Sequence, residues 1–143
     1  MKTAELIEPE QVTETTQNVI HLPLGLLGFE QIKNYALVSN PDEAPFLWLK
    51  VMDNDSLAFV VISPTVALPD YNPQFSEQDM RFLGLNRPQD MLMFNIVTIR
   101  SPDSATVNLK GPIVLNRRTL VGKQIIPLNA VNFPVKHPLL VVR

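Results

Sequence analysis

The two histidines of this sequence are the first residues to consider as catalytic groups or metal ligands, because imidazole titrates near neutral pH and is the commonest protein ligand for metals. His21 lies between Ile20 and Leu22 in an apolar run, and His137 directly precedes Pro138. The chain has no cysteine that could complete a mixed ligand set. Two histidines fall short of a structural metal site, so we predict ordinary surface or hydrogen-bonded histidines and no metal or cofactor.

Asp53 and Asp55 form a second candidate, because two carboxylates one residue apart can share a hard cation. A calcium loop of the EF-hand type that began at Asp53 would need a glutamate at its twelfth position, where Pro64 stands. Asn and Asp tolerate left-handed backbone and bond their own main chain. We therefore predict that residues 53–56 form a hairpin turn.

Motifs for nucleophilic catalysis or phosphate binding are absent from the sequence. There is no G-x-S-x-G elbow, and the segment Gly25-Leu26-Leu27-Gly28 lacks the Lys-Ser/Thr pair of a phosphate-binding loop. Without cysteine there is neither thiolate chemistry nor a disulfide. Two carboxylates that meet only in space would leave no pattern in the sequence, and no residue singles out such a pair. We predict that the protein is not an enzyme.

Length, charge and composition narrow the class of protein. A chain of 143 residues fits one domain, and 45% hydrophobic residues favour a packed core over disorder. The net charge of −2 and the single basic doublet, Arg117-Arg118, argue against direct binding of nucleic acid. The longest apolar run, residues 57–62, is far below the roughly 20 residues of a membrane span, and no signal-peptide pattern follows Lys2. We expect a soluble, cytoplasmic monomer.

Short apolar segments separated by turn-forming residues predict the elements that would position any site. The 13 prolines favour short strands and constrained loops, because proline cannot donate a hydrogen bond inside a sheet. Strands at this spacing are typical of a β-sandwich or barrel. Residues 1–16 are polar and are expected to be loosely ordered or to form an edge strand, and residues 17–143 to form the single domain. The predicted strands cover residues 17–22, 35–38, 46–52, 57–62, 91–99, 106–109, 113–115 and 120–126.

One helix of about two turns is predicted to begin after Ser76. Ser76 can cap the helix, Asp79 stands three residues later as in a capping box, and Gly84 fits the C-terminal stop. So short a helix must be held by packing. Residues 63–73 contain three prolines and are predicted to be a loop.

Aromatic residues are candidates for either the core or a contact surface. Phe46, Trp48 and Phe59 lie in predicted strands, and we expect them in the core. Phe29 and Tyr71 lie in connections rich in Gly and Pro, where contact residues are common. For these two residues both interpretations stay open.

Two glycines and two asparagines are interpreted as structural residues. Gly25 and Gly28 are expected where the backbone needs positive φ. Asn108 and Asn116 are expected to bond the backbone at strand ends.

An ordered set of segments resembles the FliW family of flagellar assembly factors. The likeness covers about residues 17–140. Its best segments are similar to the family patterns G-L-x-G-F-E, N-L-x-A-P-I-V-I-N and A-x-Q-V-I-L. The similar segments are residues 24–30, 45–49, 58–61, 63–64, 71, 107–116 and 122–126. Lys50 stands where Gln is common and Gly111 where Ala is common, so partner affinity would differ if these positions touch a partner.

The resemblance implies a compact, antiparallel β-barrel-like domain, all-β with one or two short helices, and no catalysis. It also implies two protein partners: the C-terminal region of flagellin before export, and carbon storage regulator A, a small RNA-binding translational repressor. The two partners compete. When flagellin is secreted, the freed factor captures the regulator and relieves repression of flagellin translation.

Residues on loops, on the predicted helix and at departures from the family pattern are the candidates for partner binding. Acidic members of this set suit a basic, RNA-binding partner, and Asp53, Asp55 and Asp79 belong to the same acidic group. The alternative is a peptide- or carbohydrate-binding β module without a flagellar role, marked by an open groove that Tyr71 and Trp48 would line. An enzyme would instead show a deep pocket with convergent polar groups. The partner-binding candidates are Phe29, Glu30, Lys50, Asp70, Tyr71 and Glu77.

Overall fold

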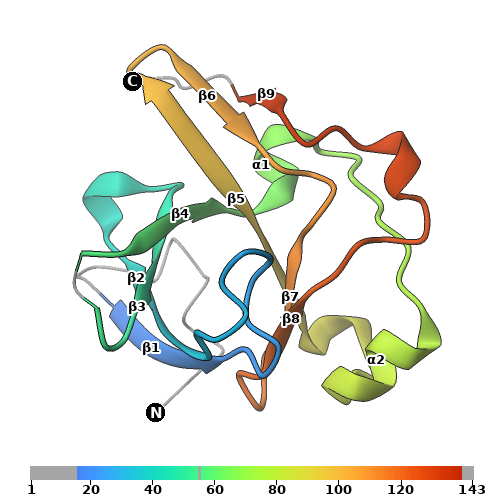
Figure 1. Cartoon of the computed structure of the whole chain (residues 1–143). Helices are drawn as coiled ribbons and strands as arrows, with labels where there is room; N and C mark the ends of the chain where they lie inside the picture. The colour runs from blue at the N-terminus through green and yellow to red at the C-terminus, as the bar shows by residue number, and fades with distance from the viewer. Residues whose placement is uncertain (1–15, 55, 140–143) are drawn as a thin grey trace.

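The computed structural model describes residues 16–54 and 56–139, which form nine mostly antiparallel strands and two short helices (Figure 1). The prediction for the segment 1–16 falls almost entirely outside these residues, as does Asp55. Single turns of 3-10 helix lie at Pro41–Glu43 (η3), Pro88–Asp90 (η4) and Ala130–Asn132 (η5). The helices are α1 (Pro64–Ala67) and α2 (Glu77–Leu83). The strands are β1 (Thr16–His21), β2 (Asn34–Ser39), β3 (Leu47–Val51), β4 (Ala58–Ile62), β5 (Met91–Ser101), β6 (Ser104–Val107), β7 (Ile113–Asn116), β8 (Gly122–Gln124) and β9 (His137–Leu139).

The long strand β5 divides the sheet into two branches. Its first residues pair with β7, which pairs with β8, while its later residues pair with β6, which pairs with β9. On its other side the order runs β4-β3-β2-β1. Strands β1 and β8 do not form a ladder, but a parallel bridge joins His21 to Val121, and the His21 N–H donates to the Leu120 carbonyl at 2.9 Å. The predicted antiparallel, barrel-like domain is confirmed, with a sheet that is not closed.

Alternate residues of the strands fill the inside of this incomplete barrel. Ile20 lies opposite Tyr35, and Leu37 lies opposite Leu49, and all four are at most 1% exposed. Each fully buried Ile or Leu contributes about 1.5–3 kcal/mol relative to an exposed one. The register of β1, β2 and β3 is therefore fixed, because a slip of one residue would turn these side chains to solvent.

Two smaller clusters extend the core beyond the barrel. Tyr71 and Phe133 pack edge to face, with ring centroids 4.8 Å apart, beneath the β6–β9 branch. Helix α2 rests on the other branch through Leu83, which packs with Val114 and Ile125. Among the described residues, no helix is long and apolar enough to span a bilayer.

The helix predicted after Ser76 is confirmed with its caps. The Ser76 hydroxyl accepts from the Asp79 N–H at 3.0 Å, and Gly84 ends α2 with φ 66°. The Asp79 carboxylate pairs with Lys123 on β8, so the acidic residue of the capping box also ties the helix to the sheet.

The predicted loop over residues 63–73 is wrong at its start, where α1 forms one helical turn. Pro64 stands in its first turn, where its fixed φ suits a helix, and the Leu68 N–H donates to the Pro64 carbonyl at 2.9 Å. Strand β9, whose three residues include Pro138, is not among the predicted strands. Strand β6 ends at Val107, two residues before the predicted end.

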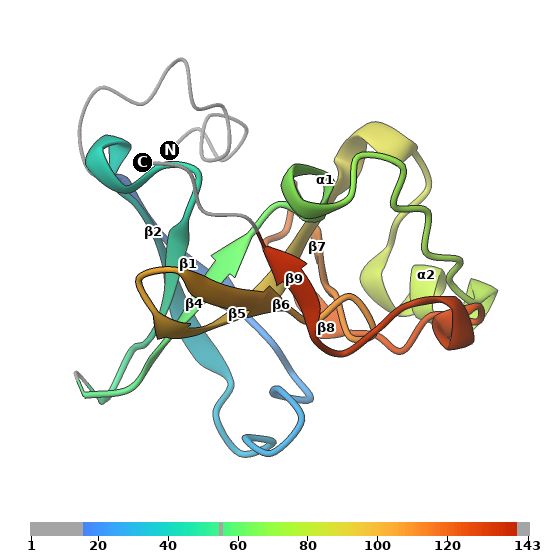
Figure 2. The ribbon, with the colours of Figure 1, turned by 90° about the horizontal axis from the view of Figure 1, so that it is seen from above.

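The connection between β1 and β2 covers one end of the barrel. Leu22 and Leu26 from this loop are almost fully buried, and Gly25 and Gly28 have φ of 67° and 88°, as predicted. Figure 2 shows this loop at one end of the sheet, with η3 and α1 at the opposite end. The two ends of the barrel therefore differ: a folded loop covers one, and short helical turns flank the other.

The two glycines of this loop should respond differently to alanine. A Cβ at Gly25 would lie 2.5 Å from the Phe29 carbonyl oxygen, whereas a Cβ at Gly28 meets nothing within 4 Å. Gly28→Ala should cost only the strain of positive φ, about 1–2 kcal/mol. Gly25→Ala adds overpacking and should cost about 2–4 kcal/mol in total. Urea unfolding checks this order, and equal losses would show that the loop backbone relaxes freely.

Candidate functional site: an apolar groove at the open end of the barrel

A groove of about 420 Å³ opens at the end of the barrel that the loop does not cover. Its walls come from η3 and the start of β3, from α1, and from the start of β5. The floor is the core itself, because Leu92 and Phe94 line the groove and also pack inside the barrel. Met91, Met93 and Val66 add apolar surface nearer the rim. The groove thus has a floor of buried core residues, and its exposed apolar area comes from partly buried residues and from Val66.

Local sequence explains why these walls stand apart. The Asn40 side chain accepts from the Asp42 N–H at 3.0 Å and so caps η3, which Pro41 begins. On the opposite side Ser63 precedes α1. Both turns project from the ends of strands and do not continue the ladder, so the space between them stays open.

Arginines cluster around Asp90, and one of them, Arg117, lines the groove. The Arg117 N–H donates to the Asp90 carbonyl at 2.7 Å. Arg87 donates to both carboxylate oxygens of Asp90, at 3.2 Å each, and Arg118 lies 3.8 Å from the same carboxylate. Asp90 itself is only 6% exposed. The hydrogen bonds from Arg87 are the main cause that holds the pKa of Asp90 below 3.8, and the nearby arginine charges lower it further.

The residues that line the groove suit binding more than bond-making. Ser39, Ser63 and Thr65 supply hydroxyl groups, but the described lining residues include no His, Asp or Glu that could act as their base. Within residues 16–54 and 56–139, no group of three or more His, Asp or Glu residues could hold a metal ion. His21 is exposed, with Nδ1 bonded to the Asn34 side chain at 2.9 Å, and His137 lies on β9. Chemically, the groove can hold apolar side chains.

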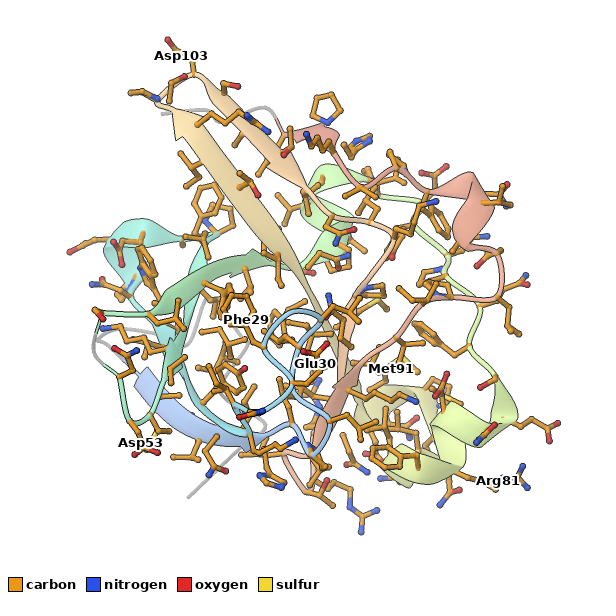
Figure 3. All side chains as sticks on the ribbon, viewed as in Figure 1. Phe29, Glu30, Asp53, Arg81, Met91 and Asp103 are labelled. Atoms are coloured by element: carbon orange, nitrogen blue, oxygen red, sulfur yellow. The ribbon has the colours of Figure 1, made fainter. Side chains whose placement is uncertain are left out.

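The predicted contact residues Phe29 and Glu30 lie together on the loop at the covered end (Figure 3). Phe29 is 37% exposed and meets Phe59 edge to face, with centroids 5.1 Å apart. Glu30 is exposed, and its carboxylate accepts from the Gly28 N–H at 3.1 Å. That hydrogen bond is the largest cause that lowers the pKa of Glu30. Both residues are accessible, but neither faces the groove.

Lys50 is exposed on the outer face of the barrel, in the same shallow depression as Trp48. The expectation that Trp48 belongs to the core is wrong: it is half-buried on the outer face, and its indole N–H donates to the Glu43 carboxylate at 3.1 Å. The alternation of β3 accounts for this, because the inward positions are taken by Leu47, Leu49 and Val51.

Asp70 and Glu77 are exposed, but Tyr71 between them is in the core. Tyr71 is 9% exposed, and its hydroxyl donates to the Leu109 carbonyl at 2.5 Å. As a surface contact residue, Tyr71 was the wrong choice, because its ring offers a partner almost no area. The open groove expected of a carbohydrate-binding module, with Tyr71 in its wall, is not formed. Asp53 lies at the tip of the β3–β4 turn, as predicted (Figure 3).

The proposed contact residues therefore do not form one site, and none of them lines the groove. The signal that could have found it is the proline-rich segments 41–45 and 63–64, which interrupt strands on both sides of the opening. Proline ends the hydrogen-bonded pairing of a strand and leaves the apolar residues beneath that end without a further strand to cover them.

One side chain connects three of the segments that suggested a family. The Leu27 N–H donates to the Gln124 side-chain oxygen at 2.8 Å, and the Gln124 amide donates to the Gly111 carbonyl at 3.0 Å. A Cβ at Gly111 would lie 3.0 Å from the same amide nitrogen. These segments therefore meet where the loop between β1 and β2 is hydrogen-bonded to β8. The sequence pattern that they share indicates contacts that stabilise the fold.

Comparison with known proteins decides the family. A model of the FliW protein family matches residues 5–139. The chain belongs to the FliW family. It is 40% identical over 121 residues to the flagellar assembly factor FliW of Leptospira interrogans, covering 83% of this chain and 79% of that protein. It is 35% identical over 131 residues to the FliW of Natranaerobius thermophilus, covering 90% and 86%. A crystal structure of the flagellar assembly factor FliW superimposes with a TM-score of 0.77 at 30% identity and covers 86% of each chain.

Removal of the charge on Asp90 should make this FliW-family protein less stable in a pH-dependent way. Because the folded-state pKa is lowered below 3.8, the ionised carboxylate stabilises the fold above that pH. Asp90→Asn should lower the unfolding temperature at pH 7, and the difference should shrink as pH falls below about 3.8. Thermal unfolding across this range is the measurement, with Asp103→Asn in the exposed β5–β6 turn as control. A difference that does not change with pH would assign Asp90 a packing role only.

Proposed function

We propose that this flagellar assembly factor works without catalysis, by holding two protein partners in the cytoplasm: the C-terminal region of flagellin and carbon storage regulator A. The observation that carries the proposal is the apolar groove at the open end of the barrel, whose described lining offers contact area and no paired nucleophile and base. An uncovered apolar surface of this kind on a small domain marks a site for a partner.

The groove suits an apolar segment of flagellin. The terminal region of flagellin is apolar on one face and would aggregate if left uncovered before export. Binding of that face to a groove stabilises the unassembled chain by mass action alone. Val66 is half exposed and Phe46 half buried at the groove, so both have area to lose to a partner.

The regulator should be attracted to acidic positions elsewhere on the surface. An RNA-binding repressor is basic, and this chain has a net charge of −2. Asp70, Glu77 and Glu30 are exposed. Complementary charge accelerates association and selects partners. We further propose that the two partners exclude one another although they contact different surfaces, so that the amount of free factor reports flagellin export.

Calorimetric titration of the full chain with the organism's flagellin, and then with its regulator, tests the proposal. We expect binding to each partner alone and loss of regulator binding when flagellin is present. Both partners must first be shown to be folded or competent by an independent assay. No heat with either partner would reject the proposed function and leave the family assignment intact.

Charge reversal on the acidic surface should weaken regulator binding. In Asp70→Lys combined with Glu77→Lys, each exposed pair lost is worth a few tenths to one kcal/mol, so we expect Kd to rise about threefold to thirtyfold. The effect should fall mainly on the association rate and diminish at high salt. Asp103→Lys, in a turn at the far tip of β5, is the matched control. An unchanged Kd would remove Asp70 and Glu77 from the contact surface.

A further inference from the structure

The connection from β8 to β9 carries four exposed aliphatic side chains within ten residues: Ile126, Leu128, Val131 and Val135. Val131 is 88% exposed and Leu128 is 70% exposed, the two largest fractions among the large apolar side chains that the structure describes. A single exposed aliphatic residue is ordinary, but several close together indicate a contact surface. None of the four lines the groove, so this surface is separate from it.

Buried side chains and backbone hydrogen bonds hold this connection in place. Ile125 is buried in the cluster beneath α2, and the ring of Phe133 packs edge to face on Tyr71. Between these two positions the Leu128 N–H donates to the Gln74 carbonyl at 2.7 Å. The exposed aliphatic side chains therefore stand on a backbone that is already ordered, which lowers the entropy cost of binding a partner.

The side chain of Asn129 joins this connection to the segment before α2. Its oxygen accepts from the Gln74 N–H at 2.8 Å, and its amide donates to the Asn72 carbonyl at 3.1 Å. In Figure 1 the red turn of η5 lies beside the green segment that runs toward α2. That segment carries Asp70, two residues before Asn72, and Glu77, three residues after Gln74. Apolar and acidic residues thus lie on two segments that are bonded to each other.

The two segments, residues 69–78 and 126–135, are here called the η5 surface. They contain two carboxylates, Asp70 and Glu77, and no Lys or Arg. Both carboxylates are exposed, and neither forms an ion pair with another residue in the described part of the chain. They are therefore available to the cations of a partner.

The cations nearest in sequence lie beyond the η5 surface or are already paired. Lys123 contacts the carboxylate of Asp79. Arg81 is in the last turn of α2, and Lys136 directly precedes β9. Each of these two cations is seven residues from the hydrogen bonds of Asn129, whereas the two carboxylates are two and three residues from them. The negative charge is thus the nearer one to the exposed aliphatic side chains along the chain.

We propose that the η5 surface is the docking site of the basic partner. Leu128 and Val131 become buried at the centre of the contact, and Asp70 and Glu77 pair with lysines or arginines of the partner at its edge. An apolar centre with a charged edge is the usual plan of a protein–protein interface. This inference rests on the proposed function, and it names the surface and the contact chemistry for one of the two partners. It also requires that the contact face of the regulator carry apolar side chains among its cations.

The apolar and charged contacts should respond differently to salt. Exposed ion pairs add little affinity and are screened as the ionic strength rises. Burial of aliphatic side chains does not depend on charge and supplies most of the affinity. A contact made by Asp70 and Glu77 alone would vanish at high salt, whereas the proposed contact should keep its apolar share.

The test is calorimetric titration of the full chain with the regulator at low and at high salt. Leu128→Asn combined with Val131→Asn should weaken binding about thirtyfold or more at both salt concentrations, because two aliphatic side chains lose a buried contact. Leu27→Asn combined with Ile99→Asn is the matched control, since both residues are exposed aliphatic side chains outside the η5 surface. The control should bind as the unaltered chain does. Thermal unfolding checks that both variants fold, and both should still bind flagellin.

Four results would overturn the inference. Binding of the regulator at full strength by the Leu128 and Val131 variant would do so and would leave the proposed function standing. An equal or larger loss in the control variant would move the contact away from the η5 surface. Loss of flagellin binding with regulator binding retained would assign the surface to flagellin. A concentration-dependent dimer by light scattering, disrupted by the Leu128 and Val131 changes, would show that a second copy of this chain covers the surface. Absence of regulator binding by the unaltered chain would instead reject the proposed function, and this inference with it.

Discussion

Strand β5 pairs with β7 at its start and with β6 at its end, so it belongs to two sheets. The rest of the structure depends on how the chain satisfies the backbone where these two sheets separate. At the branch, where β7 and β6 diverge, the regular ladder cannot satisfy every backbone group. The buried side chain of Asn95 donates to the Asn108 carbonyl at 2.7 Å, and the Asn108 N–H donates to the Ile96 carbonyl at 2.9 Å. Tyr71 then satisfies the Leu109 carbonyl from the other side. Side chains thus replace the missing ladder bonds, as a buried branch requires.

This branch explains why the barrel has one covered and one open end. Strands β7 and β8 turn toward β1 but reach it only at the bridge between His21 and Val121, so the ring is held together without a full ladder. Gln124 fastens the loop over the nearer end through Leu27. At the other end the strands give way to proline-initiated turns that cannot add to the sheet. A groove with a core-like floor is the direct result.

Sequence patterns that depend on neighbouring residues predicted this structure well. The strand positions, the caps of α2 at Ser76 and Gly84, and the positive φ of Gly25 and Gly28 all follow from local stereochemistry. Asn108 and Asn116 bond the backbone as expected, through the Lys110 N–H and the Leu83 carbonyl. These features are decided within a few residues of the chain, which is why one sequence suffices to find them.

Features that depend on how distant strands pack together could not be predicted from the sequence in this way. Trp48 lies on the outer face although its hydrophobicity predicted the core, and Tyr71 lies in the core, where its loop position had left both interpretations open. The groove joins residues from four separate segments, and no spacing in the sequence predicts it. The segments that resemble the family did not indicate the groove either. Several of them meet instead at the covered end of the barrel, through the hydrogen bonds of Gln124.

The two methionines at the groove have a consequence for how this protein can change over evolutionary time. Met91 and Met93 lie on strand β5 and line the groove together with Phe46 and Val66. Methionine is unbranched and polarisable, so it can repack against ligand shapes that a branched side chain would refuse. A client whose apolar residues drift in size could keep its chaperone without a matching substitution. Adaptable methionines at the groove would therefore let the client sequence change without requiring a compensating substitution in this protein.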